Sequence, residues 1–195
     1  MTKIAIGLFG FGRTGSVVAN ELIKNAEIDL CWVVRKSNKN QGEYSSTLLG
    51  HEHKEGEIFS VQNMDFDKFY KENKVDVIID FSHSCSVKEY KNSVLEGIRI
   101  VSAVSNYSTE EFRLLHSLSE KTAVLYSPNI TLGINFLIEV SKMLKKVTPY
   151  VDIEIVEEHF REKKDVSGTA LRIAKDLGLD PVEHVNSVRV GGIVG

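Results

Sequence analysis

Short apolar runs alternate with amphipathic stretches through the first two thirds of the chain, an order typical of strands joined by helices. Nearly continuous apolar runs predict buried strands at residues 4–9, 30–34, 58–61, 75–81, 98–104 and 123–126. Stretches of helical composition lie between most of these strands, at residues 16–25, 65–73, 86–96 and 108–120. Such an order predicts parallel βαβ units with right-handed crossovers, and hence an α/β protein built on a doubly wound, Rossmann-type parallel sheet.

The pattern changes after Pro128-Asn129, a dipeptide typical of a loop. Apolar residues then recur at the spacing of one helix face, at Phe136, Leu137, Val140, Leu144 and Val147. A half-exposed strand, a loop with a helix, and a final strand are predicted next, at residues 152–157, 165–177 and 187–194. We therefore expect a dinucleotide-binding domain over residues 1–128 and a smaller α+β domain, for substrate binding and oligomerisation, over residues 129–195.

A glycine-rich stretch, Gly10-Phe11-Gly12-Arg13-Thr14-Gly15, lies between the first predicted strand and the first predicted helix. In a dinucleotide-binding turn the first glycine permits a tight turn, the second lets the backbone approach a pyrophosphate, and the third lets helix and strand pack closely. The phosphates would lie at the helix N-terminus, where free N–H groups and the helix dipole favour negative charge. The same pattern also occurs in turns that bind nothing, so its place between strand and helix is what favours cofactor binding.

The second predicted strand ends in Arg35-Lys36-Ser37, with no acidic residue at its tip. A site specific for NAD usually places Asp or Glu there for the ribose hydroxyl, whereas an NADP site places a cation for the 2′-phosphate. Arg can hold that phosphate with two parallel hydrogen bonds, and Lys can act as a point charge. We expect NADPH to be preferred, with NADH as the second cofactor; a solvated strand end is the alternative interpretation.

Composition narrows the class of protein only slightly. The 195 residues are 42% hydrophobic and 26% charged, as in ordinary globular proteins, and a net charge of -3 gives no reason to expect a nucleic-acid or membrane partner. Met1 leads directly into the first strand and no apolar run reaches about 18 residues, from which we expect a cytoplasmic protein. Cys31 and Cys85 lack metal-ligand spacing and predict reduced thiols, and His51 and His53 predict a polar loop rather than a metal site.

The densest group of titratable residues lies at 157–170, ahead of a predicted helix. His159 and Lys163 can both donate protons near neutral pH when their surroundings tune them. The turn Ser167-Gly168-Thr169 can cap the helix and offer N–H groups and hydroxyls to a carboxylate. From composition alone, a charged surface loop before a capped helix is an equally good interpretation.

The chain resembles the bacterial 4-hydroxy-tetrahydrodipicolinate reductase family over essentially its whole length. The resemblance rests on the glycine-rich stretch and on residues 77–82, 127–135 and 157–170. In the family, the last segment reads roughly E-x-H-H-x-x-K-x-D-x-P-S-G-T-A. By this likeness His159 and Lys163 would be catalytic, and the Ser167-Gly168-Thr169 turn would hold a substrate carboxylate.

The resemblance implies hydride transfer from NAD(P)H to a cyclic imine dicarboxylate, which reduces 4-hydroxy-tetrahydrodipicolinate to tetrahydrodipicolinate in lysine and diaminopimelate biosynthesis. Closure of the two domains would orient the reactants. The cofactor contacts that we expect are Gly10, Phe11, Gly12, Arg13, Thr14, Gly15, Arg35, Lys36, Phe81, Ser82, Ala103, Ser105 and Asn129. The substrate contacts that we expect are Ser105, Phe160, Ser167, Gly168 and Thr169.

The sequence departs from the family at four places. Phe160 stands where the family has its second His, and the Pro before the Ser-Gly-Thr turn is absent. The family's G-T-T-G turn corresponds here to residues 103–106, which read Ala-Val-Ser-Asn. The family also continues past the segment that resembles residues 188–195, with strands that complete the second domain and build a tetramer, so that assembly is in doubt here. A related NADPH-dependent dehydrogenase of another amino or diamino acid, and a non-catalytic NADPH-binding protein, are the alternatives.

Overall fold

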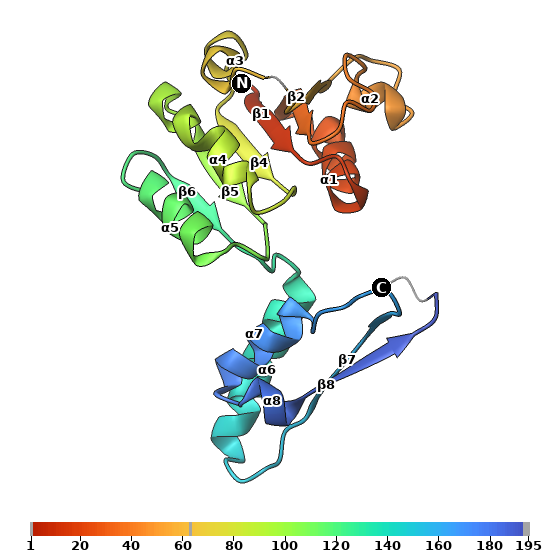
Figure 1. Ribbon diagram of the computed structural model, residues 1–195, viewed down its shortest axis with the longest axis vertical. Helices are drawn as coiled ribbons and strands as arrows, with labels where there is room; N and C mark the ends of the chain where they lie inside the picture. Colours follow the sequence, from red (N-terminus) through yellow and green to blue (C-terminus); the bar gives the residue numbers. More distant parts are fainter. Residues whose placement is uncertain (1, 63, 193–195) are drawn as a thin grey trace. The chain divides into compact units, whose positions relative to one another are not determined.

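The computed structural model describes residues 2–62 and 64–192. The chain divides after Pro128 into two compact units, each of which is described by itself (Figure 1). Within the described residues, no helix is both long enough and apolar enough to cross a membrane.

The first unit contains a sheet of six parallel strands in the order β3-β2-β1-β4-β5-β6. The strands are β1 Ile4–Phe9, β2 Ile28–Arg35, β3 Glu57–Ser60, β4 Val77–Asp80, β5 Arg99–Ser102 and β6 Val124–Tyr126. The helices are α1 Arg13–Lys24, α2 Ser45–Leu48, α3 Phe66–Glu72, α4 Ser86–Tyr90, the 3₁₀ helix η1 Lys91–Glu96 and α5 Thr109–Leu118. The predicted doubly wound, Rossmann-type sheet is therefore confirmed.

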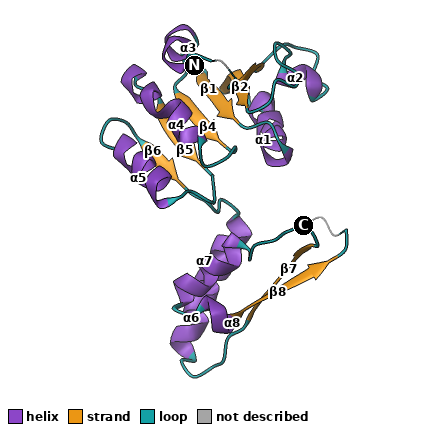
Figure 2. Cartoon of the chain, in the orientation of Figure 1, coloured by secondary structure: helices purple, strands orange, loops and turns teal. Residues whose placement is uncertain are grey.

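Helices cover both faces of this sheet, which is why its strands read as continuous apolar runs (Figure 2). On one face, Ile6 and Leu8 of β1 pack with Ala19 and Ile23 of α1. On the other face, Phe9 and its neighbours pack in a cluster that includes the fully buried aromatic side chains Trp32, Tyr70 and Tyr90.

Local signals set several helix ends in the first unit. Ser108 and Glu111 form a capping box at the start of α5. Gly97, in the left-handed region at φ 77°, ends the segment predicted as one helix at residues 86–96. That segment is α4 followed by η1 rather than a single α-helix, and the segment between β2 and β3 contains the short helix α2.

In its described part, up to residue 192, the second unit has three helices and a two-stranded parallel sheet. Its elements are α6 Leu132–Val147, β7 Ile155–Phe160, α7 Gly168–Leu177, α8 Pro181–His184 and β8 Val185–Val190. A small core of Ile138, Ile173 and Leu177 holds α6 against α7. The apolar stripe predicted at helical spacing lies on α6, but Phe136 and Val147 are 69% and 79% exposed.

Both predicted strands of the second unit are displaced from the positions expected. The strand predicted at residues 152–157 runs from Ile155 to Phe160, because backbone partners on β8 exist only for those six residues. The predicted strand therefore ended three residues too early and left out His159 and Phe160. The final strand begins two residues earlier than predicted and ends at Val190; residues 193 and 194 of that prediction lie outside the described residues.

Candidate functional site

The glycine-rich turn joins β1 to α1, and its three glycines occupy different surroundings. Gly10 has a φ of 98°, and a Cβ built on it would lie 2.7 Å from the Phe81 carbonyl oxygen. A Cβ on Gly15 would lie 2.2 Å from the Gly10 carbonyl oxygen, so helix and turn are in direct contact. A Cβ on Gly12 would meet nothing within 4 Å, so this part of the turn is open to a ligand.

The start of α1 can accept an anion. Gly12 is the N-cap residue and provides no side-chain cap, and the first turn contains no acidic residue. Arg13 and Thr14 are exposed there, while Phe11 is half-buried against the apolar cluster beneath. Unsatisfied N–H groups and the positive end of the helix dipole therefore face the place where phosphates bind in such turns.

The other cofactor candidates follow the carboxyl ends of neighbouring strands, which lie at one edge of a parallel sheet. Arg35 ends β2, the Phe81-Ser82 segment follows β4, and Ala103 and Ser105 follow β5. The strand order reverses between β1 and β4, and ligands of such sheets bind at that switch point. The structure thus brings together the predicted residues of the first unit, from Gly10 to Ser105. Asn129 belongs to the second unit.

Asp80, which the sequence analysis did not single out, fixes the segment after β4. Its side chain is fully buried, and one carboxylate oxygen accepts hydrogen bonds from the Ser82 amide at 2.9 Å and the Ser82 hydroxyl at 2.6 Å. The other oxygen accepts from the Ser86 hydroxyl at 2.5 Å. Burial raises the pKa of Asp80, and these hydrogen bonds oppose that shift. An acidic residue at the end of an otherwise apolar strand was the signal that could have indicated it.

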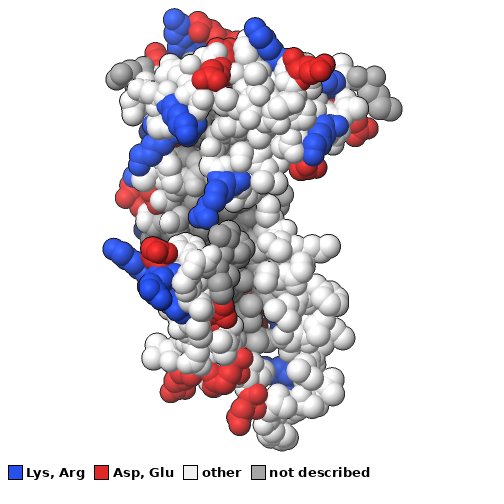
Figure 3. All heavy atoms as spheres, turned by 90° about the vertical axis from the view of Figure 1, so that its right-hand side faces the viewer, with Lys and Arg blue, Asp and Glu red and all other residues white. Residues whose placement is uncertain are grey.

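Charges of both signs are interspersed on the face drawn in Figure 3. Positive charge for the 2′-phosphate of NADPH must therefore come from a few neighbouring side chains rather than from a large basic surface. Arg35 is half-buried at the end of β2, and Lys36 beside it is exposed. The charge of Lys36 also acts on Glu89 of α4. Burial and, to a smaller extent, the charge of Asp80 raise the pKa of Glu89 to about 7, whereas the positive charge of Lys36 acts to lower it.

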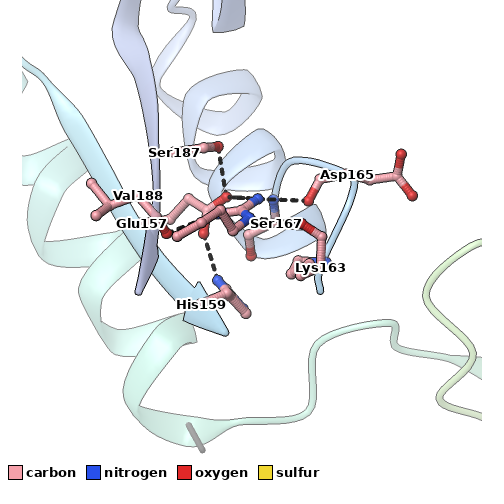
Figure 4. Close-up of polar contacts among 8 residues, drawn as sticks. Glu157, His159, Lys163, Asp165, Ser167, Ser187 and Val188 are labelled. Atoms are coloured by element: carbon pink, nitrogen blue, oxygen red, sulfur yellow. Dashed lines mark hydrogen bonds and ion pairs between the residues drawn. The ribbon is translucent and has the colours of Figure 1, made fainter. Parts of the chain in front are cut away.

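In the second unit, polar contacts converge on the carboxylate of Glu157, which is 8% exposed (Figure 4). Its Oε1 atom accepts hydrogen bonds from the Ser167 amide at 3.1 Å, the Ser187 hydroxyl at 2.7 Å and Arg189 Nη2 at 3.0 Å. Its Oε2 atom lies 2.5 Å from His159 Nδ1. Four groups from β7, β8 and the start of α7 are therefore held by one side chain.

The ionisation of Glu157 determines which ring nitrogen of His159 carries the hydrogen. Burial alone would raise the pKa of Glu157, but hydrogen bonds from Arg189, Ser187, His159 and the Ser167 amide outweigh it and hold the pKa at about 2. An ionised carboxylate can only accept hydrogen bonds, so His159 Nδ1 carries the hydrogen. Nε2 is then the ring nitrogen that remains to act on a substrate.

Lys163 lies on the turn between β7 and α7. The Arg189 side chain holds this turn through hydrogen bonds to the turn's backbone carbonyl groups. The Lys163 amide donates to the Phe160 carbonyl at 3.2 Å. Arg189 donates from Nε to the Lys163 carbonyl at 2.8 Å and from Nη2 to the Asp165 carbonyl at 2.9 Å. Phe160 itself ends β7 and is half-buried.

The Ser167-Gly168-Thr169 turn begins α7, but not with the predicted side-chain cap. Ser167 is the N-cap residue, yet its side chain makes no capping hydrogen bond. Its amide donates to Glu157, so of the N–H groups that this turn was expected to offer a substrate carboxylate, one is already paired. The amides of Gly168 and Thr169, in the first turn of α7, are the N–H groups of this turn that can still be offered to a ligand.

A cavity of about 540 Å³ adjoins this cluster, between α6, β7 and α7. Glu157, His159, Ser167 and Thr169 line it together with apolar side chains that include Ile155 and Ile173. A largely apolar cavity with a few converging polar groups is typical of sites for small molecules.

His51 and His53, the pair considered as metal ligands in the sequence, each contact another side chain. His51 Nε2 lies 2.9 Å from the Asn20 side-chain oxygen, and His53 Nε2 lies 3.0 Å from a Glu55 carboxylate oxygen. Among the described residues, no cluster of three or more His, Cys, Asp or Glu side chains could hold a metal ion. Cys31 and Cys85 are both free cysteines.

We expect the stability of the second unit to fall on acidification below about pH 4.5, the ordinary pKa of Glu. The folded-state pKa of Glu157, about 2, lies below that value, so its contribution is complete above pH 4.5 and is lost as the pH falls toward 2. Glu111 of the first unit also has a pKa lowered to about 2, chiefly by the Ser108 amide, so the measurement must resolve the units. Amide hydrogen exchange of α7 and β8 between pH 7 and 2 does so. An identical pH dependence in Glu157→Gln would contradict this expectation.

A parallel sheet with a glycine-rich turn at its switch point is the fold of Rossmann-type dinucleotide-binding proteins. Two family models match the chain end to end: dihydrodipicolinate reductase, N-terminus, over residues 4–130, and dihydrodipicolinate reductase, C-terminus, over residues 130–195. The chain therefore belongs to the dihydrodipicolinate reductase family.

Relatives agree with this membership. A 4-hydroxy-tetrahydrodipicolinate reductase of Buchnera aphidicola subsp. Cinara cedri is 34% identical over 180 residues, which cover 89% of this chain and 63% of that protein. One of Methanocaldococcus jannaschii is 30% identical over 201 residues, covering 100% of this chain and 71% of that protein. The chain thus spans less than two thirds of the length of the Buchnera relative.

The fold is shared with a solved structure, dipicolinate-bound dihydrodipicolinate reductase from Paenisporosarcina sp. TG-14. The TM-score is 0.69 at 19% sequence identity, and the match covers 99% of this chain and 81% of that one.

Proposed function

We propose that this chain reduces 4-hydroxy-tetrahydrodipicolinate to tetrahydrodipicolinate with NAD(P)H, a step of lysine and diaminopimelate biosynthesis. Residues 1–128 bind the dinucleotide and residues 129–195 bind the cyclic dicarboxylate. The observation that carries the proposal is the cluster around Glu157, because it holds His159, the Lys163 turn and the start of α7 in one place. The reductase names of the relatives support the choice of substrate.

The first unit fits a dinucleotide. Gly12 leaves the turn open where a pyrophosphate would lie, and Gly10 brings the Phe81-Ser82 segment close to that turn. The open N–H groups at the start of α1 would hold the phosphates. The bound nicotinamide supplies a hydride; the chain's own task is to place the acceptor carbon and to manage charge and protons around it.

The second unit supplies the proton chemistry. Gly168 and Thr169 offer amides at the start of α7 to a substrate carboxylate, and Lys163 adds positive charge. Lys163 is the proposed proton donor to the atom that gains negative charge as the hydride arrives, and His159 acts through Nε2. The hydroxyl group leaves as water, so one hydride and one proton are consumed for each product formed.

Transfer of isotope tests this chemistry directly. With NADPH carrying deuterium at the transferred position, we expect deuterium in the tetrahydrodipicolinate, read by mass spectrometry. Oxidation of NADPH without deuterium in that product would contradict the proposal. It would favour the alternative that Phe160, half-buried at the end of β7, suits a related dehydrogenase acting on another amino or diamino acid.

We propose that Arg35 and Lys36 select NADPH over NADH. Replacing both by alanine removes charge-assisted hydrogen bonds of about 1.5–3 kcal/mol each, so we expect KM for NADPH to rise about 10²-fold to 10⁴-fold. KM for NADH should hardly change, because NADH carries no 2′-phosphate. Lys39→Ala, an exposed lysine of the same loop, is the matched control. Equal loss with both cofactors would refute this assignment.

A further inference from the structure

Arg189 lies on β8, opposite His159 of β7 in the register of the parallel pair. Glu157 lies opposite Ser187 in the same register, so the period of two places all four residues on one face of the small sheet. The Glu157 and Arg189 side chains are 7% and 20% exposed, and they form an ion pair with Nη2 and Oε1 3.0 Å apart.

The guanidinium group of Arg189 holds more than its ion-pair partner. Its donors reach the carbonyl oxygens of Lys163 at 2.8 Å, Asp165 at 2.9 Å and Val188 at 3.0 Å, in addition to Glu157. The first two carbonyls belong to the turn that carries Lys163. A planar fork of donors can satisfy several acceptors at fixed angles, which an ammonium group on a flexible chain cannot do.

Glu157, the ion-pair partner of Arg189, contacts His159 and the start of α7. Its Oε2 atom orients His159 through Nδ1, and its Oε1 atom holds the amide at the start of α7. Figure 4 shows the carboxylate at the centre of these contacts, with β7, β8 and α7 around it. Glu157 and Arg189 thereby contact the two parts of the site that carry the proposed catalytic groups, His159 and the Lys163 turn.

We propose that Glu157 and Arg189 form a positioning pair that sets the orientation of His159 and the Lys163 turn for catalysis. The kinetic part of this inference rests on the proposed function. Replacing both side chains by apolar residues removes the desolvation cost of the two charges together with their attraction, and such double replacements are often neutral for stability. A double replacement can therefore remove the geometry that the pair imposes while the fold persists.

The first test is Arg189→Lys, which keeps the charge and loses the fork. We expect kcat to fall about 100-fold, the scale of a misplaced catalytic group, while KM for NADPH and the melting temperature stay near the wild-type values. Arg172→Lys is the matched control, because Arg172 forms an ion pair with Asp176 within α7, at 3.0 Å, and takes part in none of the contacts described above. Retention of kcat in Arg189→Lys would overturn the proposal, because charge alone would then suffice.

The second test does not depend on turnover. Nitrogen-15 spectra of the imidazole groups report which ring nitrogen carries the hydrogen, and we expect the Nδ1–H form for neutral His159 in the wild type, assigned with His159→Asn. In the double variant Glu157→Met/Arg189→Met, which removes both charges, we expect that preference to disappear while the fold persists. A folded double variant that keeps the Nδ1–H form would overturn the proposal. A wild type inactive on the proposed substrate, yet with the expected spectra, would overturn the proposed function and leave the positioning pair standing.

Discussion

Replacing His159 or Lys163 by alanine is expected to lower turnover by about 10²-fold to 10⁴-fold, the range that general acid–base groups usually contribute. Each side chain is placed by contacts that survive its removal: Glu157 remains held by Arg189 and Ser187, and the Lys163 turn is held through its backbone carbonyl. The loss should therefore fall on kcat and not on the fold. Steady-state rates at saturating NADPH, with circular dichroism of each variant, measure both quantities.

Lys164→Ala is the matched control for Lys163→Ala. Lys164 is the next residue of the same turn and is exposed, whereas Lys163 is half-buried. We expect wild-type turnover in Lys164→Ala and unchanged NADPH affinity in all three variants, because the cofactor candidates for phosphate binding lie in the first unit. Full turnover in both His159→Ala and Lys163→Ala would show that this cluster is not the catalytic site.

Gly10→Ala is expected to lower the free energy of unfolding of the first unit by about 2–4 kcal/mol and to abolish NADPH binding at micromolar concentrations. The added methyl group would lie within 3 Å of the Phe81 carbonyl and the Ser82 amide, both of them backbone atoms. A φ of 98° also disfavours any residue with a Cβ. Urea unfolding followed by the fluorescence of Trp32, which is buried in this unit, reports the stability change.

Gly12→Ala separates cofactor binding from folding at the same turn. Its methyl group would meet no protein atom within 4 Å, so we expect the free energy of unfolding to stay within about 1 kcal/mol of the wild-type value. NADPH affinity should nevertheless fall about 10-fold or more, because the methyl group would occupy space that the pyrophosphate needs. Titration calorimetry measures the affinity. Unchanged NADPH affinity in Gly12→Ala would contradict the placement of the phosphates.

Most of the fold could be predicted because the signals are local or repeat along the chain. Buried parallel strands produce apolar runs such as residues 4–9, and the Ser108 capping box fixes the start of α5 within four residues of sequence. The strand limits near residue 155 could not be predicted, because they depend on which residues of β8 supply partners.

The candidate site could be predicted only where its residues are contiguous. His159, Lys163 and the Ser167 turn stand within ten residues of one another and match one motif. Arg189 is separated from Glu157 by a helix pair, and only the parallel register of β7 and β8 brings them together. The position of Glu157 two residues before His159 could have indicated that their side chains lie on the same face of β7, since residues two apart share a face of a strand.

The most direct test of the proposed reduction is oxidation of NADPH by this chain with 4-hydroxy-tetrahydrodipicolinate generated in place from pyruvate and aspartate semialdehyde by its synthase. Absorbance of NADPH is followed, with NADH in a parallel reaction. We expect rapid oxidation that requires the synthase, and a higher kcat/KM with NADPH than with NADH. No synthase-dependent oxidation by a folded chain that binds NADPH would contradict the account.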